Sequence, residues 1–369
     1  MDPRAPFMAR AIEVATHGLG RTSPNPCVGA VAVREGVIVA EAHTAEYGGP
    51  HAEAALIASA KPEELRGADL YVTLEPCAHH GKTPPCADAV IAAGFRSCHY
   101  AVEDPNPLTR GQGAERCRDA GLEVSAGLLA AQARWSLAPY LKWVRTRRPL
   151  VTAKWAMTLD GRIAAHTGDS QWISGPEALE RTRGERRRYD AILVGRGTQR
   201  SDDPRLSSRD PADPQPTRVL LDSSFGLSDD AQLVRTADDV ETIVFGSTGH
   251  DADQRRLTKA GVTTEVVPRD ADGLDLASVL ERLGERGVCH LLVEGGGEVL
   301  GSFFDDGAVD RVQVIVAAKI IGGSDARSPV GGVGVSKLAD ALMVSPLEVT
   351  PLGLDQMFFG AITAAGRGE

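Results

Sequence analysis

The segment Thr73-Leu-Glu-Pro-Cys-Ala-His-His-Gly-Lys-Thr-Pro-Pro-Cys86 leaves a β-rich run and enters a loop of proline, histidine and glycine. It places Cys77 just after the predicted strand Leu70–Leu74 and Cys86 at the start of a predicted helix. Upstream, His51-Ala-Glu53 opens an alanine- and leucine-rich run that predicts another helix. One imidazole and two thiols therefore stand at the ends of regular elements, where an α/β fold commonly gathers functional side chains.

These side chains have the chemistry of a catalytic zinc site. One histidine and two cysteines suit Zn²⁺ and leave a fourth position for water, whose pKa the metal lowers to about 7. Glu53 lies two residues beyond His51, close enough to move protons without binding the metal. The order His-x-Glu, then Pro-Cys, is that of zinc-dependent base deaminases. Two alternatives stay open: unrelated core and loop residues, or a structural zinc closed by His79 or His80.

The spacing of the two cysteines separates this chain from deaminases that act on nucleic acids. Their second and third ligands are typically two residues apart, whereas Ala78 to Pro85 lie between Cys77 and Cys86 here. The longer loop brings His79, His80 and Lys82 to the rim, where Lys82 would meet a phosphate as a point charge. The alternative interpretation is that these three residues are ordinary solvated loop residues.

Strands and helices alternate around this segment, which predicts a largely parallel sheet with helices on both faces. The run Arg145-Thr-Arg-Arg-Pro149 breaks the last helix of this half, so we expect a first domain over 1–146 and a second over 147–369. The predicted elements of the first half are strands Val28–Val33, Val37–Ala42, Leu70–Leu74, Cys98–Val102 and Leu122–Ser125, and helices Ala5–Gly18, His51–Ala60, Cys86–Ala93, Gly111–Ala120 and Leu128–Arg145.

The second half repeats the α/β alternation and ends in two strands joined near Gly353. Its strand His290–Glu294 runs into Glu294-Gly-Gly-Gly-Glu-Val-Leu-Gly301, a glycine turn before a helix that favours an anion, although a tight turn without ligand is an equal alternative. The arginine-rich helix Pro176–Arg188 is typical of a solvated face, or of a phosphate site if one arginine enters a cleft. The other predicted strands are Leu150–Ala156, Ala191–Val194, Arg218–Asp222, Thr242–Phe245, Thr264–Val267 and Val309–Ala317.

Composition narrows the class of protein. The chain has 40 Lys+Arg and 50 Asp+Glu, a net charge of −10, which disfavours a nucleic-acid or anionic-membrane binder. No stretch approaches the ~18 apolar residues of a membrane span, and residues 1–10 lack the apolar core of a secretion signal. With six cysteines in 369 residues, we expect reduced thiols and a cytoplasmic protein.

Four motifs of the first half together resemble the bifunctional riboflavin-biosynthesis deaminase/reductases of bacteria: Asn25-Pro-Cys-Val-Gly29, His51-Ala-Glu53, Thr73–Cys86 and Glu103-Asp-Pro-Asn-Pro107. The resemblance implies a cytidine-deaminase-like three-layer domain. Its substrate would be a diaminopyrimidinone carrying a ribosylamino 5′-phosphate, hydrolysed to the uracil with release of ammonia. By position, the residues that bind this substrate would be Asn25, His43, Lys82, Asp104 and Asn106.

Four motifs of the second half resemble the reductase domain of the same enzymes: Lys154–Arg162, Gly168–Ile173, Asp202–Leu206 and Glu294–Gly297. The resemblance implies a dihydrofolate-reductase-like fold that uses NADPH to reduce the ribosyl group to ribityl. The NADPH site would be lined by Ala156, Trp172, Thr198, Asp202, Ser223, Gly296, Gly297, Glu298, Val299, Leu300, Gly301 and Ser302. The substrate would meet Lys154, Ser170, Arg186, Leu206, Arg209 and Glu294.

We thus expect a homo-oligomeric enzyme with zinc and NADPH as cofactors and no nucleic-acid or membrane partner. Competing hypotheses are a nucleic-acid or nucleoside deaminase with an appended domain, a protein with a purely structural zinc, and a deaminase whose second domain is inactive.

Overall fold

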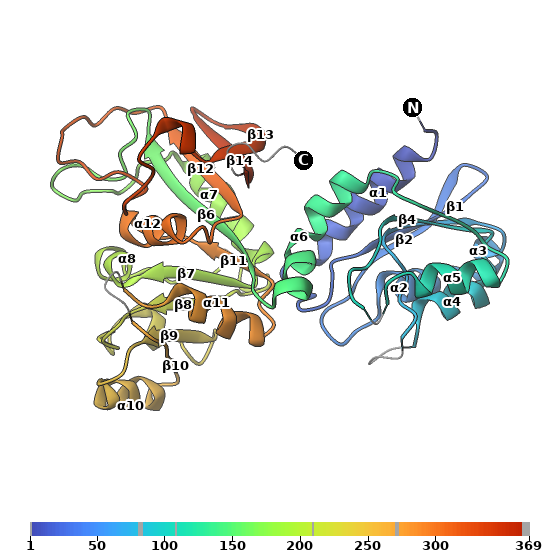
Figure 1. Ribbon diagram of the computed structural model, residues 1–369, viewed down its shortest axis with the longest axis horizontal. Helices are drawn as coiled ribbons and strands as arrows, with labels where there is room; N and C mark the ends of the chain where they lie inside the picture. Colours follow the sequence, from blue (N-terminus) through green and yellow to red (C-terminus); the bar gives the residue numbers. More distant parts are fainter. Residues whose placement is uncertain (1, 80–83, 108, 209, 270–272, 364–369) are drawn as a thin grey trace. The chain divides into compact units, whose positions relative to one another are not determined.

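The computed structural model describes residues 2–79, 84–107, 109–208, 210–269 and 273–363 (Figure 1). The chain divides into two compact units, Met1–Arg148 and Pro149–Glu369, each with its own sheet. The division predicted after residue 146 falls at the last residue of the helix α6 (Ala130–Thr146). Among the described residues, no helix combines the length and the apolar character that crossing a bilayer requires.

The first unit is built on a five-stranded mixed sheet of order β2-β1-β3-β4-β5. Strands β3, β4 and β5 are parallel, but β1 is antiparallel to both β2 and β3, so the prediction of a largely parallel sheet is corrected. The turn Glu35-Gly36, with both φ values positive (51° and 78°), reverses the chain between β1 and β2. The strands are β1 (Gly29–Arg34), β2 (Val37–His43), β3 (Asp69–Leu74), β4 (Ser97–Val102) and β5 (Glu123–Ala126).

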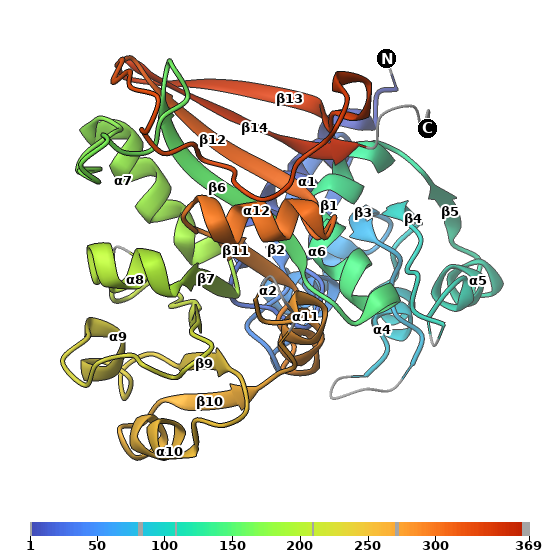
Figure 2. The same cartoon turned by 60° about the vertical axis from the view of Figure 1, so that its left-hand side comes forward.

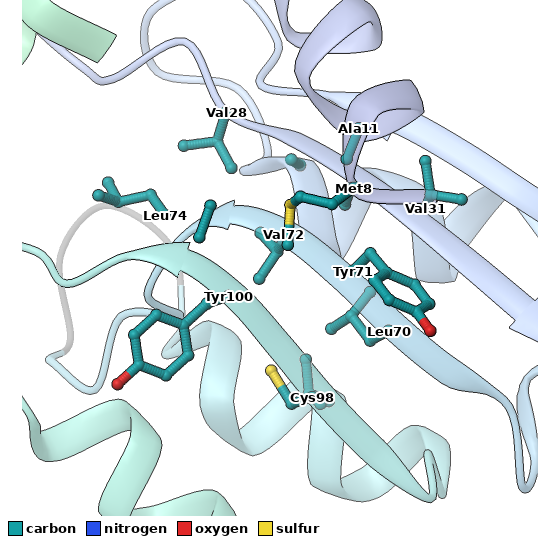
Figure 3. Packing of buried hydrophobic residues seen from close by; sticks show 14 of the residues in the cluster. Met8, Ala11, Val28, Val31, Leu70, Tyr71, Val72, Leu74, Cys98 and Tyr100 are labelled. Atoms are coloured by element: carbon teal, nitrogen blue, oxygen red, sulfur yellow. The ribbon is translucent and has the colours of Figure 1, made fainter. Parts of the chain in front are cut away.

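Helices cover both faces of this sheet, as predicted. On one face α1 (Ala5–Ala15) packs over β1 and β3, and α6 packs over β4. Figure 3 shows Met8 and Ala11 of α1 among side chains of β1 and β3, within one continuous apolar cluster. The other face carries α2 (Ala52–Ser59), α4 (Cys86–Ala93) and α5 (Gln112–Asp119), with α2 against α4 and α4 against α5. The N-terminal ends of α2 and α4 carry His51 and Cys86.

The second unit contains a nine-stranded sheet of order β10-β9-β8-β7-β11-β6-β12-β14-β13. Its first seven strands are parallel, and the C-terminal hairpin β13–β14 adds two antiparallel strands beside β12. The strands are β6 (Leu150–Thr158), β7 (Ala191–Gly195), β8 (Thr217–Leu221), β9 (Thr242–Gly246), β10 (Thr263–Val266), β11 (His290–Val293), β12 (Arg311–Ala317), β13 (Met343–Leu352) and β14 (Asp355–Thr363).

Alternate residues of the parallel strands form two separate cores. Ala191 and Leu193 of β7 face the cluster that includes α11 (Leu276–Glu285) and α12 (Gly297–Asp305), whereas Ile192 and Val194 face a second cluster. Both sides of the sheet are thus buried, which explains the continuous apolar runs of these strands. Figure 2 shows α11 and α12 on one side of the sheet. The remaining helices of this unit are α7 (Pro176–Glu185), α8 (Arg196–Asp202), α9 (Gln232–Arg235) and α10 (Asp251–Lys259).

Three short helices were not predicted: α3 (Pro62–Leu65), α8 and α9. Each is a single turn or two, too short for a helical hydrophobic period to emerge from the sequence. Of the three, α8 matters for function, because it follows β7 directly at the carboxyl edge of the parallel sheet.

Candidate active sites

His51, Cys77 and Cys86 converge in the first unit. His51 precedes α2, Cys77 lies three residues beyond β3, and Cys86 begins α4. The His51 Nδ1 atom is 3.3 Å from the Sγ atom of Cys86 and 3.6 Å from that of Cys77. All three ligand atoms lie within 4.8 Å of one another, the only such group among the described residues.

This geometry fits zinc. Tetrahedral Zn–S and Zn–N bonds of about 2.3 and 2.1 Å imply an S···N separation of roughly 3.6 Å, close to both observed values. The backbone N–H of Cys86 donates to the Cys77 sulfur at 3.3 Å, an interaction that favours a thiolate. Hydrogen bonds from Cys86 and His51 lower the pKa of Cys77 despite its burial, and the Cys77 contact raises the pKa of His51.

The described residues supply three ligands and no fourth. The His79 Nδ1 atom lies 3.0 Å from the hydroxyl of Thr109 and is not part of the ligand group. His80 and Lys82 lie outside the described residues. Three protein ligands with an open fourth position are typical of catalytic zinc, and His79, one of the two candidates for a closing ligand, does not join the group.

Glu53 lies at the second helical position of α2, beside the ligand group. Its side chain is 4% exposed and within hydrogen-bonding range of the Cys86 thiol. Burial, helped by the negative charge of Cys77, raises the pKa of Glu53 to about 7. A carboxyl group of that pKa both accepts and returns a proton near neutral pH, which is the behaviour required of a general acid–base.

A second carboxylate, Glu75, anchors the loop that carries Asp104 and Asn106. The buried Glu75 side chain accepts hydrogen bonds from the backbone N–H groups of Gly111 (3.0 Å) and Ala114 (3.1 Å), and more weakly from that of Asp104 (3.4 Å). Asp104 in turn accepts from the hydroxyl of Tyr140 at 2.9 Å and from the N–H of Asn106 at 2.9 Å. The sequence analysis missed Glu75 and Tyr140, although Glu75 directly precedes Pro76-Cys77.

The other two substrate residues predicted for the first unit are Asn25 and His43. Asn25 lies in the turn before β1, where its N–H donates to the carbonyl of Thr22 at 2.9 Å. His43 ends β2, with its Nδ1 atom 2.8 Å from the carbonyl of Thr44 and its ring edge-on to that of His17.

In the second unit, most predicted residues gather at the carboxyl ends of parallel strands. Thr198 follows β7, Ser223 follows β8, and Glu294 and Gly296 follow β11. The N–H of Gly296 donates to the Thr198 hydroxyl at 3.0 Å, which ties two of these strand ends together. Ligands of open α/β sheets bind at this edge.

Arg186, Glu294 and Lys154 form a buried charged cluster there. The guanidinium of Arg186 makes a bidentate pair with Glu294 (3.0 and 2.7 Å) and donates to the carbonyl of Ser207, the residue after Leu206, at 3.2 Å. Burial alone would raise the pKa of Glu294, but Arg186 and Lys154 outweigh it and lower this pKa to about 2. Burial lowers the pKa of Lys154, with Glu294 opposing. Because the Nε and Nη2 atoms of Arg186 both donate to Glu294, this edge of the guanidinium is not available to bind a phosphate.

The glycine segment before α12 has two different faces. A Cβ on Gly297 or Gly301 would come within 2.8 Å of Ser328 or Gly331 atoms, so these glycines allow the segment 328–332 to pack on α12. Leu300 is fully buried in the core, and its backbone N–H donates to the carbonyl of Gly296 at 3.1 Å. Gly296, by contrast, precedes the helix and faces Thr198. Of the predicted cofactor residues in this segment, Glu298, Val299 and Ser302 lie on the first two turns of α12.

The loop between β6 and α7 carries Ser170 and Trp172. The indole of Trp172 is 56% exposed, and the guanidinium of Arg183 lies over it, 5.1 Å from the ring centroid. Lys319 donates to the Trp172 carbonyl at 2.7 Å. The sequence analysis did not single out this role of Arg183. Ala156 lies in β6 and Asp202 ends α8, while Arg209 lies outside the described residues.

Comparisons with known proteins agree with this architecture. Residues 1–102 match the family described as the cytidine and deoxycytidylate deaminase zinc-binding region, and residues 149–356 match the RibD C-terminal domain. The riboflavin biosynthesis protein RibD of Actinobacillus pleuropneumoniae is 40% identical over 95% of this chain and 93% of its own length. That of Escherichia coli is 36% identical over 95% and 96%.

Two solved structures match nearly the whole chain. Acinetobacter baumannii RibD (form 1) has a TM-score of 0.87 and 31% identity, covering 98% of this chain and 99% of its own. The diaminohydroxyphosphoribosylaminopyrimidine deaminase/5-amino-6-(5-phosphoribosylamino)uracil reductase of Thermotoga maritima has a TM-score of 0.84 and 36% identity over the same shares.

Fold and site thus define a zinc-dependent deaminase domain joined to an α/β reductase domain, which confirms the predicted fold class. The chain belongs to the family of bifunctional riboflavin-biosynthesis deaminase/reductases. It is therefore an enzyme with both activities, and its cofactors are zinc and NADPH, as predicted.

Proposed function

We propose that residues 1–146 deaminate 2,5-diamino-6-(5-phosphoribosylamino)pyrimidin-4-one to the aminouracil. Residues 147–369 would then reduce the ribosyl group of that product to ribityl with NADPH. The observation that carries the first step is the convergence of His51, Cys77 and Cys86 beside the buried carboxyl of Glu53. The two domains act on the same phosphorylated scaffold in succession.

Deamination needs one group that takes a proton from water and delivers it to the departing amine. His51, Cys77 and Cys86 would hold zinc, which would supply Lewis acidity to the attacking water. The Glu53 carboxylate accepts the proton of that water and, once protonated, donates it to the amino group that leaves as ammonia. The buried position of Glu53, two residues from His51 and beside the ligand group, supports both halves of this transfer.

The remaining assignments of the first domain position the substrate. Asp104 and Asn106 would hydrogen-bond the pyrimidine from the loop anchored by Glu75, and Asn25 and His43 would contact it from the ends of β1 and β2. Lys82 would bind the 5′-phosphate as a cation. Proximity fixed in this way is itself a large part of catalysis.

The second domain would bind NADPH, which would supply the hydride that reduces C1′ of the ring-opened ribosyl group. Its site would comprise the backbone from Gly296 to Ser302 together with Ala156, Trp172, Thr198, Asp202 and Ser223. The substrate would lie against Ser170, Leu206 and the cluster of Lys154, Arg186 and Glu294, with Lys154 nearest to C1′. Since Glu294 occupies Arg186, Arg209 is the stronger candidate for the substrate phosphate.

The substitution Glu53→Gln tests the deaminase assignment. We expect ammonia release to fall by about 10²–10⁴-fold, with zinc content unchanged and reduction of the pre-deaminated substrate intact. The matched control is Glu63→Gln, which alters an exposed glutamate on α3 and should change none of the three readouts. Full ammonia release by the Glu53→Gln enzyme would refute the assignment of Glu53.

We further propose a cytoplasmic homo-oligomer. The described structure forms no disulfide among the six cysteines, which supports a reducing compartment. Strand β13, at the edge of the nine-stranded sheet, exposes Met343, Leu347 and Val349, and an apolar sheet edge favours pairing with a second copy. Sedimentation velocity on the full chain tests this: a monomer at micromolar concentration would refute it.

A further inference from the structure

An ion pair that the assignments above leave unused joins the carboxyl ends of β7 and β8. Arg196, the residue after β7, places its Nη1 atom 3.3 Å from a carboxylate oxygen of Asp222, the residue after β8. The same Nη1 donates to the hydroxyl of Ser224 at 2.6 Å, and that hydroxyl donates to Asp222 at 3.1 Å. Three polar side chains thus form one network at the edge where ligands of parallel sheets bind.

The network has hydrogen-bonding capacity that the protein does not use. Asp222 is 1% exposed, yet its Oδ2 atom has no partner, and the buried Nε atom of Arg196 has none either. Buried polar atoms are nearly always paired, so two unpaired atoms in one ion pair mark a network that the protein itself does not fully satisfy. About a third of the Arg196 side chain is exposed, so the cation is accessible while its anchor is buried.

The location of the network relates it to the cofactor. Thr198, two residues after Arg196, accepts the N–H of Gly296 at the start of α12, where a helix of nine residues favours the cofactor pyrophosphate. On its other side, Ser223 lies between Asp222 and Ser224, and Ser247 beyond β9 fixes its carbonyl at 2.8 Å. A dinucleotide whose pyrophosphate lies at Gly296 would extend its adenosine half along this edge, towards β8.

The charges at this position distinguish the two nicotinamide cofactors. In dinucleotide sites, a free carboxylate at the end of the second strand accepts a hydrogen bond from the ribose 2′-hydroxyl and so selects NADH, whereas an arginine accommodates the 2′-phosphate of NADPH. Here the carboxylate of Asp222 is neutralised by Arg196. We propose that Arg196 binds the 2′-phosphate of NADPH, with Asp222 and Ser224 as the residues that position its guanidinium and Ser223 as a neighbouring hydroxyl donor.

This inference rests on the proposed placement of NADPH in the second domain. It adds the residue that selects NADPH over NADH. Removing the guanidinium would both delete the cation and expose the charge of Asp222 to the 2′-phosphate. The loss should therefore fall on NADPH alone, because the 2′-hydroxyl of NADH is uncharged and can donate a hydrogen bond to a carboxylate.

The test is a titration of the full-length protein with NADPH, NADH, 2′-AMP and 5′-AMP, for the wild type and for Arg196→Gln. The matched control is Arg200→Gln, which removes an exposed arginine four residues further along α8. We expect Arg196→Gln to weaken NADPH and 2′-AMP by about 10- to 100-fold, the effect of losing a charge-assisted hydrogen bond. Binding of NADH should change by less than about threefold, and Arg200→Gln should resemble the wild type.

Other outcomes overturn the inference. Equal weakening of NADPH and NADH would make Arg196 a structural clamp, and unchanged binding would leave it no role in selection. Equal affinity of the wild type for both cofactors would refute selection while leaving the reductase assignment intact, whereas binding of neither would refute the assignment itself. If Arg196→Gln fails to fold, Arg196→Lys replaces it. This variant keeps the charge without the planar guanidinium, so it should weaken the binding of NADPH and 2′-AMP to an intermediate extent and leave NADH unchanged. A wild type that binds 2′-AMP no more tightly than 5′-AMP would disprove selection.

Discussion

Replacing Arg186 with methionine should destabilise the second unit, because it leaves the buried carboxylate of Glu294 without its partner. The side chains of Arg186 and Glu294 are only 17% and 11% exposed, so solvent screens their interaction weakly. The pKa of Glu294 falls from an ordinary 4.5 to about 2. A shift of that size corresponds to roughly 3 kcal/mol at neutral pH. The cost of breaking a buried ion pair is about 3–5 kcal/mol, which agrees.

The pH dependence has a definite sign. Because the folded-state pKa of Glu294 is lowered, its contribution is present above pH 4.5 and is lost as the pH falls through about 2. At pH 3.5 the wild type should have lost about 1.4 kcal/mol of this contribution. The substitution Glu294→Gln removes this ionisation and should remove this part of the pH dependence.

The assay is hydrogen exchange in β11 and β12, which reports the stability of the second unit separately from the first. Arg186→Met should lower the free energy of opening of these strands by about 3 kcal/mol at pH 7. The control Arg187→Met breaks the exposed pair with Asp213, in which the arginine side chain is 52% exposed, and should cost less than about 1 kcal/mol. Equal effects of the two substitutions, or a double variant Arg186→Met/Glu294→Gln as unstable as Arg186→Met alone, would refute the reasoning.

Two further predictions concern the zinc site and acid stability. Gly113→Ala should weaken zinc binding at least about tenfold, measured by competition with a chelator. The reason is that a Cβ at residue 113 would lie 1.8 Å from the carbonyl oxygen of Pro76, next to Cys77. The control Gly184→Ala, whose Cβ would meet nothing within 4 Å, should leave zinc binding unchanged. Burial lowers the pKa of His290 in the folded protein to about 3. As the pH drops below 6.5, His290 therefore takes up a proton in the unfolded chain but not in the folded one, and the stability of the fold decreases. The wild type should lose about 1.4 kcal/mol more than His290→Gln between pH 7.5 and 5.5 in urea unfolding, and equal losses would contradict the prediction.

Most strands and helices of the fold were predictable from local patterns in the sequence. Strands such as β7 and β11 are short apolar runs bounded by turns, and their ends were predicted within a residue or two. The candidate zinc ligands His51, Cys77 and Cys86 were recognisable because their residue types and order are specific to one chemistry. The short helix α8 was missed because its seven residues, Arg196–Asp202, contain no apolar period.

Other features depend on which strands become neighbours. The antiparallel pairing of β1 with β3 and the meeting of Arg196 with Asp222 follow from the strand order of each sheet, which no local pattern encodes. The commitment of Arg186 to Glu294 joins residues 108 positions apart. Sequence reasoning placed both residues near the substrate but not in contact with each other.

The hydrogen bonds of Glu75 have a consequence for the geometry of catalysis. This one carboxylate sits two residues from Cys77 and also holds the backbone at Gly111 and Ala114 that bounds the loop with Asp104. The segment with Cys77 and the loop with Asp104 are therefore both held in place by the same residue, Glu75. Under the proposed function, Glu75 would hold a pyrimidine bound by this loop at a fixed position relative to Cys77, and the loss of its negative charge would free the loop to move relative to that residue.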